Sequence, residues 1–181
     1  CRDLAYHGAQ HVGCGLGIDS IAFSIWGAGK VVGLDVAHRP LAVARKFVWA
    51  MGPPTDVTFV EGDAAEECRT NSRAPLASQT FDLIWAIDVV AYLDDAQRRA
   101  LFEHLKKHAA EQAEFRFTVP ADNLMGRLFK PRVVRALDTT ESVDRLLWDT
   151  GWRRARKVQD ARDETQPRGV KDQLLVVALL R

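Results

Sequence analysis

The chain has 181 residues and a formal net charge of +1, from 25 basic and 24 acidic side chains. This balance leaves no basic excess to neutralise many phosphates, so we expect no nucleic-acid partner. No apolar run reaches the ~20 residues that a membrane span needs, so we expect no membrane partner. The length suits one domain over residues 1–181 with a single core.

The three cysteines do not have the spacing of a metal site or a disulfide framework. Cys1, Cys14 and Cys68 form an odd set without a C-x-x-C pair, which indicates neither a zinc site nor disulfide pairing. No secretory signal precedes the first predicted strand. We therefore expect no bound metal and a cytoplasmic location, and the sequence makes no prediction of oligomeric state.

A glycine-rich segment follows a short first strand, which is predicted over residues 8–12. Residues 11–19 read HVGCGLGID, with glycines at positions 13, 15 and 17. Glycine lets a backbone turn tightly and approach a ligand closely, because a Cβ there would collide with it. A helix is predicted to open after Gly17. Its expected buried face has the spacing i, i+3, i+4, i+7 and consists of Ile18, Ile21, Ala22 and Ile25.

The second predicted strand ends in a carboxylate, because the apolar run 31–34 leads into Asp35. This order of elements, a strand, a glycine turn, a helix, a second strand and an acid, is typical of the first half of a nucleotide-binding crevice. In such a crevice the acid accepts hydrogen bonds from ribose hydroxyls. A dinucleotide fingerprint would need its third glycine at position 18, where this chain has Ile18 and places the glycine one residue earlier. The alternative is that the glycines serve only a tight turn.

With this shorter glycine spacing the chain resembles the class I S-adenosylmethionine-dependent methyltransferases. Three later segments are similar to the family's following motifs and occur in the same order: residues 33–45, 57–64 and 81–95. The resemblance spans roughly residues 8 to 181 and implies S-adenosyl-L-methionine as the cofactor. It also implies that Asp35 holds both ribose hydroxyls, and that Asp63 and Ala64 read adenine.

The resemblance also implies a full set of cofactor contacts, and simpler alternatives stand beside several of them. The set consists of His11, Gly13, Cys14, Gly15, Gly17, Asp35, Val36, Asp63, Ala64 and Ala86. Asp35 can instead be an ordinary turn acid, and Asp63 can cap a short helix over residues 64–68, since Asp is a favoured N-cap. Cys14 is expected to be a small filler within the loop rather than a nucleophile.

The fourth strand and its trailing loop, expected over residues 81–95, supply the candidates for catalysis. The carboxyl end of this strand faces the crevice, which places Ala86 and Asp88 near the methionine half of the cofactor. Asp88 and Tyr92 are the weak catalytic candidates, because they can orient an acceptor or take its proton. A capping acid and a half-buried packing ring are the alternatives.

The remaining segments complete an α/β architecture. The further predicted elements are a helix capped by Asp94 or Asp95, a strand over residues 114–119, a helix capped by Asp138 and stopped at Gly151, and two last strands over 152–158 and 174–180 joined by the polar loop 162–171. In the family this becomes a three-layer Rossmann-like sandwich. Its seven-stranded, mostly parallel sheet has the order 3-2-1-4-5-7-6 with an antiparallel last strand. We see no internal repeat and no linker.

The first strand departs from the family pattern in two ways. The family usually has an acid in place of His11, and that charge helps to hold the cofactor's ammonium group. A neutral imidazole accepts one hydrogen bond, whereas an imidazolium repels the ammonium. Asp19 either substitutes for the missing acid or only complements the helix dipole. Residues 8–12 also carry little apolar bulk for a central strand.

The expected acceptor is a small molecule. The chain lacks an Asn/Asp-Pro-Pro-Tyr/Phe pattern or a Pro-Cys pair after the fourth strand, which disfavours the methylation of amides, exocyclic amines and cytosine carbon. By elimination we predict methyl transfer to an O or N atom of a small-molecule acceptor. Residues 124–135 carry four basic side chains, which either favour an acidic acceptor or form the solvated face of a surface helix.

Two other functions compete with this prediction. Relatives usually have helices before the first strand that cover the cofactor, and only about ten residues precede the glycine loop here, so we expect this N-terminal cover to be missing or truncated. Together with His11 and the thin first strand, this favours a catalytically silent cofactor-binding module that acts as a partner subunit or sensor. A nicotinamide-dependent oxidoreductase is the third hypothesis, disfavoured by Ile18.

Overall fold

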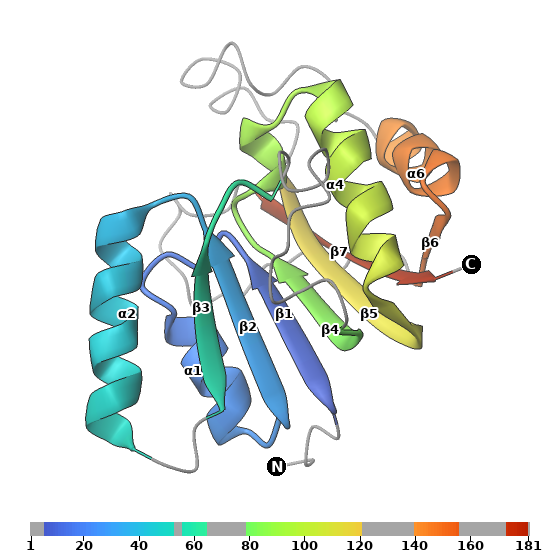
Figure 1. The fold of residues 1–181 in the computed structure, drawn as a ribbon. Helices are drawn as coiled ribbons and strands as arrows, with labels where there is room; N and C mark the ends of the chain where they lie inside the picture. Colours follow the sequence, from blue (N-terminus) through green and yellow to red (C-terminus); the bar gives the residue numbers. More distant parts are fainter. Residues whose placement is uncertain (1–5, 53–55, 65–78, 121–139, 156–172, 181) are drawn as a thin grey trace, which may run out of the picture.

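A sheet of seven strands forms the centre of the molecule (Figure 1). The computed structural model describes residues 6–52, 56–64, 79–120, 140–155 and 173–180. The strands are β1 (Gly8–Val12), β2 (Lys30–Asp35), β3 (Val57–Glu61), β4 (Phe81–Ala86), β5 (Ala109–Pro120), β6 (Trp152–Arg154) and β7 (Gln173–Leu180). The helices are α1 (Ile18–Ile25), α2 (His38–Met51), the 3-10 turn η1 (Val90–Tyr92), α4 (Asp95–Lys107) and α6 (Thr140–Asp149).

The order of the strands confirms the predicted α/β architecture. It is β3-β2-β1-β4-β5-β7-β6. Strands β1 to β5 pair in parallel, whereas β7 is antiparallel to both of its neighbours, β5 and β6. β1 therefore lies between β2 and β4 near the middle of the sheet, and the carboxyl ends of the five parallel strands meet at one edge.

The helices cover different strands on the two faces of the sheet (Figure 1). α1 and α2 lie over β1, β2 and β3, where Phe23 packs against Ala9 and Val31. α4 and α6 lie over the other face, where Phe102 stacks edge-on against Phe115 of β5. Both faces thus bury apolar side chains, as a parallel sheet requires.

The buried face of α1 differs from the prediction. Ile21 is buried, but Ile18 and Ile25 are 66 % and 63 % exposed, and the helix instead buries Ser20 and Phe23. The prediction was wrong because this helix is apolar on both sides, so the helical period alone fits either face. The position of Ser20, which forms a hydrogen bond with His11 of β1, marks the face that meets the sheet.

Several ends of elements follow the predicted signals, while the start of β5 differs. Asp94 caps α4 in a reciprocal capping box with Gln97, and Gly151 ends α6 with a left-handed φ of +83°. β5 is longer than the predicted 114–119, because it begins at Ala109.

Other sequence predictions lie outside the described residues. They are the helix over residues 64–68 beyond position 64, the basic segment 124–135, the Asp138 cap, the final residues of the strand 152–158 and the loop 162–171. Within the described ranges, every helix is too short or too polar to cross a membrane.

Candidate functional site

The fold brings the predicted site segments to one edge of the sheet. The glycine loop follows β1, Asp35 ends β2, Asp63 follows β3 and Asp88 follows β4. Because these four strands are parallel and adjacent, their carboxyl ends share an edge. Four chain segments that are far apart in the sequence therefore meet there (Figure 1).

The three loop glycines have different surroundings. Gly13, Gly15 and Gly17 all have left-handed φ values, of +70°, +51° and +72°. A Cβ on Gly13 would lie 2.2 Å from Val89 Cγ2, and one on Gly17 would lie 2.3 Å from the ring of Phe59, so these two glycines make room for protein side chains. A Cβ on Gly15 would meet nothing within 4 Å. Only this glycine of the three presents an open α-carbon.

The Asp35 carboxylate joins two backbone loops. Its Oδ2 accepts a hydrogen bond from the Gly15 N–H at 2.7 Å, and its Oδ1 accepts one from the Ala37 N–H at 2.8 Å. The N–H groups of Gly13 and Cys14 both donate to the carbonyl of Leu34. Each carboxylate oxygen has two lone pairs, so Asp35 retains acceptor capacity for a ligand after these contacts.

The start of α1 has no side-chain cap. Its N-cap is Gly17, and none of the described side chains accepts a hydrogen bond from the first turn. Uncapped N–H groups and the positive end of the helix dipole favour an anion at this position. Asp19, in that first turn, accepts a hydrogen bond from the indole of Trp85 at 3.3 Å, so the structure gives this acid a partner on β4.

His11 is buried beneath α1. Its Nδ1 lies 2.9 Å from Ser20 Oγ, and its ring packs edge-on against Phe23 with the centroids 6.3 Å apart. Only 4 % of the residue is exposed. Burial lowers the pKa of His11 to about 4, despite the opposing charges of Asp19 and Asp35. The imidazole is therefore neutral at physiological pH and faces the helix layer.

The Cys14 thiol lies under the glycine loop. It packs with Ile21, Leu41 and Phe59 in a small cluster between the helices and the sheet. Burial is the main cause that raises the pKa of this thiol to about 12. A thiol that stays protonated is a poor nucleophile, which agrees with the predicted role as a filler.

The edge beside Asp35 combines apolar and charged side chains. Leu16 of the glycine loop and Val36 are 46 % and 65 % exposed. Nearby, His38 Nδ1 lies 2.7 Å from the carboxylate of Glu61, at the end of β3. Sequence reasoning missed this pair, although the alignment of Asp35 with Glu61 across β2 and β3 brings the two strand ends together.

The structure places the predicted catalytic candidates in the turn after β4. Asp88 and Tyr92 are both exposed, with Tyr92 at 66 %. Ala86 is fully buried, so its methyl group faces the core rather than the edge. Sequence reasoning also missed Arg98 of α4, whose buried Nε donates to the carbonyl of Val90 at 3.0 Å.

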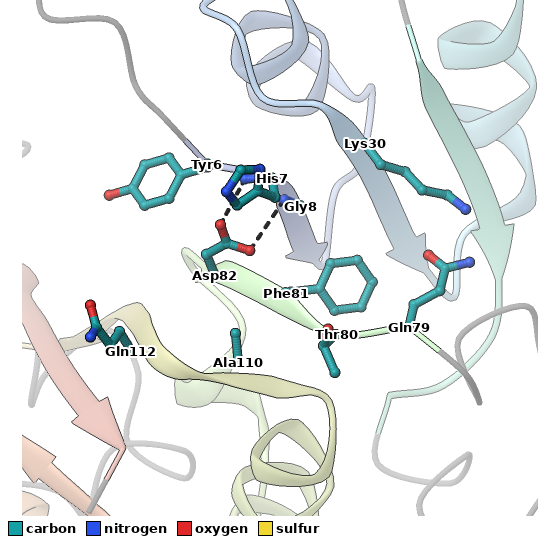
Figure 2. Close-up of a pocket in the computed structure, with 10 residues that line it drawn as sticks. All are labelled: Tyr6, His7, Gly8, Lys30, Gln79, Thr80, Phe81, Asp82, Ala110 and Gln112. Carbon is teal, nitrogen blue, oxygen red and sulfur yellow. Dashed lines mark hydrogen bonds between the residues drawn. The ribbon is translucent and has the colours of Figure 1, made fainter.

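A separate pocket of about 640 Å³ lies at the opposite edge of the sheet, where β1, β4 and β5 begin (Figure 2). Figure 2 shows the carboxylate of Asp82 directed at the backbone of β1. That carboxylate accepts hydrogen bonds from the N–H groups of His7 at 2.7 Å and Gly8 at 3.3 Å. The principal anionic group of this pocket therefore anchors the start of the central strand.

Comparisons with known proteins agree with this geometry. A family model described as a methyltransferase domain matches residues 10–112. No curated protein sequence matches the chain. The fold is similar to that of magnesium protoporphyrin IX methyltransferase from Synechocystis PCC 6803, crystallised with bound SAH, at 18 % identity and a TM-score of 0.70, covering 96 % of this chain and 74 % of that one.

Two further solved structures have the same fold. The N-methyltransferase NodS from Bradyrhizobium japonicum WM9 is 16 % identical, with a TM-score of 0.70 and coverage of 97 % of this chain and 86 % of that one. The pyocyanin biosynthetic protein PhzM is 20 % identical, with a TM-score of 0.69 and coverage of 97 % and 50 %.

Proposed function

This chain belongs to the methyltransferase domain family and is an S-adenosylmethionine-dependent enzyme, and on that premise we propose that it methylates an oxygen or nitrogen atom of a small-molecule acceptor. The observation that carries the proposal is the open α-carbon of Gly15 beside the Asp35 carboxylate, at the shared edge of four parallel strands. A ligand can approach the backbone at this point without displacing a side chain.

The residues at this edge fit the chemical groups of S-adenosylmethionine. We propose that the uncapped start of α1 binds the carboxylate of its amino-acid half. The remaining lone pairs of Asp35 would accept hydrogen bonds from the ribose hydroxyls. The exposed apolar side chains of Leu16 and Val36 suit a flat adenine ring, with Asp63 and the Ala64 backbone as its polar contacts.

His11 does not enter this proposed contact set. Its ring is buried, neutral and engaged with Ser20, so we assign it to the packing of α1 against β1. Other acceptors must therefore hold the cofactor's ammonium group, and the backbone carbonyls of the glycine loop can accept its hydrogen bonds without an acidic side chain.

The acceptor side is formed by the turn after β4. When bound, S-adenosylmethionine supplies an activated methyl group, so the protein mainly has to align the acceptor atom and exclude water. Asp88 and Tyr92 are exposed at this turn. The Asp88 carboxylate can accept the proton of an acceptor O–H or N–H group, and the Tyr92 hydroxyl can orient that group by a hydrogen bond.

Calorimetric titration tests the cofactor site. We expect S-adenosylmethionine and S-adenosylhomocysteine to bind and NAD to give no heat of binding. Release of S-adenosylhomocysteine should then be measured with panels of phenols, carboxylic acids and amines as acceptors. Binding of NAD in place of the two sulfur nucleosides would contradict the proposal. Tight cofactor binding with no turnover on any panel would instead favour the catalytically silent module.

A further inference from the structure

The turn after β4 contains a strained backbone position. Asp88 has a φ of +60°, and it is the one residue other than glycine with a positive φ in the part of the chain that the structure describes. A Cβ raises the free energy of this conformation relative to glycine, and Asp is one of the few other residues that adopt it, because its short side chain can form local hydrogen bonds. Such positions persist where the surrounding structure holds them, and they concentrate at functional sites.

Two side chains from later elements hold this turn. Thr118 Oγ1 accepts a hydrogen bond from the Asp88 N–H at 2.9 Å. Because Ala86, the last residue of β4, pairs with Phe117, the next residue of β5 stands beside the turn. From the other side, Arg98 is only 2 % exposed and donates its Nε to the carbonyl of Val90. The turn is thus fixed from both β5 and α4.

The turn after β4 also restricts the position of the glycine loop, through the side chain of Val89. Val89 Cγ2 occupies the space that a Cβ on Gly13 would need. Val89 follows Asp88 directly, and its carbonyl accepts the Tyr92 N–H at 3.0 Å within the same turn. A change in the backbone of Asp88 therefore moves the side chain that packs on Gly13.

We propose that Thr118 is a positioning residue for the cofactor site. Its hydroxyl holds Asp88 in the left-handed conformation, which keeps Val89 against Gly13 and fixes the glycine loop in the arrangement that binds the cofactor. Thr118 acts entirely through the turn, so its effect is on the ordering of the loop and not on a direct contact. The inference rests on the proposed cofactor site at Gly15 and Asp35.

The first experiment removes the hydroxyl while it keeps the shape of the side chain. Thr118→Val should weaken S-adenosylhomocysteine binding three- to tenfold in calorimetry, and Thr118→Ser, which retains the hydroxyl, should restore it. In the free protein, hydrogen exchange at the amides of Asp88 and Tyr92 should accelerate in Thr118→Val and stay at the wild-type rate in Thr118→Ser. Unchanged exchange and unchanged affinity in Thr118→Val would overturn the proposal.

A double variant separates positioning from general destabilisation. Glycine adopts a φ of +60° without the cost of a Cβ, so the Asp88→Gly chain no longer needs the hydroxyl to hold the turn. Thr118→Val should then change S-adenosylhomocysteine affinity less than twofold in the Asp88→Gly background. An equal loss in both backgrounds would overturn the proposed mechanism. If the wild-type chain binds no S-adenosylhomocysteine, the proposed function fails, and the exchange rates alone decide whether Thr118 holds the turn.

Discussion

β1 and β4 lie side by side in the sheet, but they differ in where their buried polar side chains and positive φ values occur. β1 contains buried polar side chains, Gln10 and His11, and the loop after it reaches positive φ values through glycines. β4 has apolar positions facing the core and a shift of register against β5 between Phe81 and Leu83, and its residue with a positive φ, Asp88, lies in the turn that follows. Irregularity inside a strand affects the stability of the sheet, whereas irregularity in a turn sets the position of the groups that the turn carries.

The largest effect is expected at the glycine loop after β1. Gly15→Val should weaken S-adenosylhomocysteine binding at least a thousandfold, or ~4 kcal/mol, because a branched side chain would fill the space beside the open α-carbon. Gly52→Val is the matched control, since Gly52 also has a positive φ, of +64°, and open space around it, but ends α2. Calorimetry on both variants distinguishes loss of the site from backbone strain, and normal binding by Gly15→Val would make the loop purely structural.

The buried imidazole of β1 should make stability depend on pH. The folded chain lowers the pKa of His11 from 6.5 to about 4 through burial, so between these values the unfolded state binds more protons. The free energy of unfolding should therefore have its full value above pH 6.5 and fall by about 3 kcal/mol as the pH drops to 4. Urea unfolding between pH 4 and 7 measures this. His104, whose pKa burial also lowers to about 4, acts in the same direction, so the series should be repeated in His104→Gln.

The same burial predicts how cofactor binding responds to pH. Because His11 stays neutral in the folded chain, S-adenosylhomocysteine affinity should be constant from pH 5.5 to 8. His11→Asp should lower stability, because it would place a carboxylate in the buried site beside Ser20. A fall in affinity as the pH drops through 6.5, together with tighter binding by His11→Asp, would show instead that this side chain faces the cofactor's ammonium group.

A smaller effect is expected where β2 supports the loop of β1. Asp35→Ala should weaken S-adenosylhomocysteine binding at least tenfold, since it removes charge-assisted hydrogen bonds to the ligand and also releases the N–H groups of Gly15 and Ala37. Asp35→Asn, which keeps one carbonyl oxygen, should lose less. Circular dichroism checks the fold of both variants, and an unchanged dissociation constant in a folded Asp35→Ala chain would remove this acid from the site.

The smallest effect is a gain in stability from the weak strand itself. Gln10 is fully buried, and the structure shows no hydrogen-bond partner for its Nε2 and Oε1 atoms in the described ranges. Replacing an unsatisfied buried amide by a side chain of similar size should stabilise the fold, so Gln10→Leu is expected to gain about 1 kcal/mol in urea unfolding. Gln10→Glu, with a buried charge, should do the opposite. Loss of stability in Gln10→Leu would mean that the amide makes a needed contact.

The sequence predicted the elements that depend on local signals. Glycine spacing and the strand-end acid at Asp35 indicated the candidate site, and local signals predicted the start of α4 at its Asp94 cap and the end of α6 at Gly151. It did not predict which face of α1 is buried, because that helix is apolar on both sides. Nor could it show that Arg98 and Thr118 converge on the turn after β4, since that contact exists only once α4 and β5 are packed.

The burial of Cys14 makes the glycine loop accessible to a kinetic measurement. Only 5 % of this residue is exposed, and its thiol lies beneath the loop, so an alkylating reagent can reach the thiol only when the loop opens. With Cys1 and Cys68 replaced by serine, the labelling rate equals the fraction of time spent open multiplied by the rate for a free thiol. The labelling rate of Cys14 thus measures how much of the time the glycine loop is open.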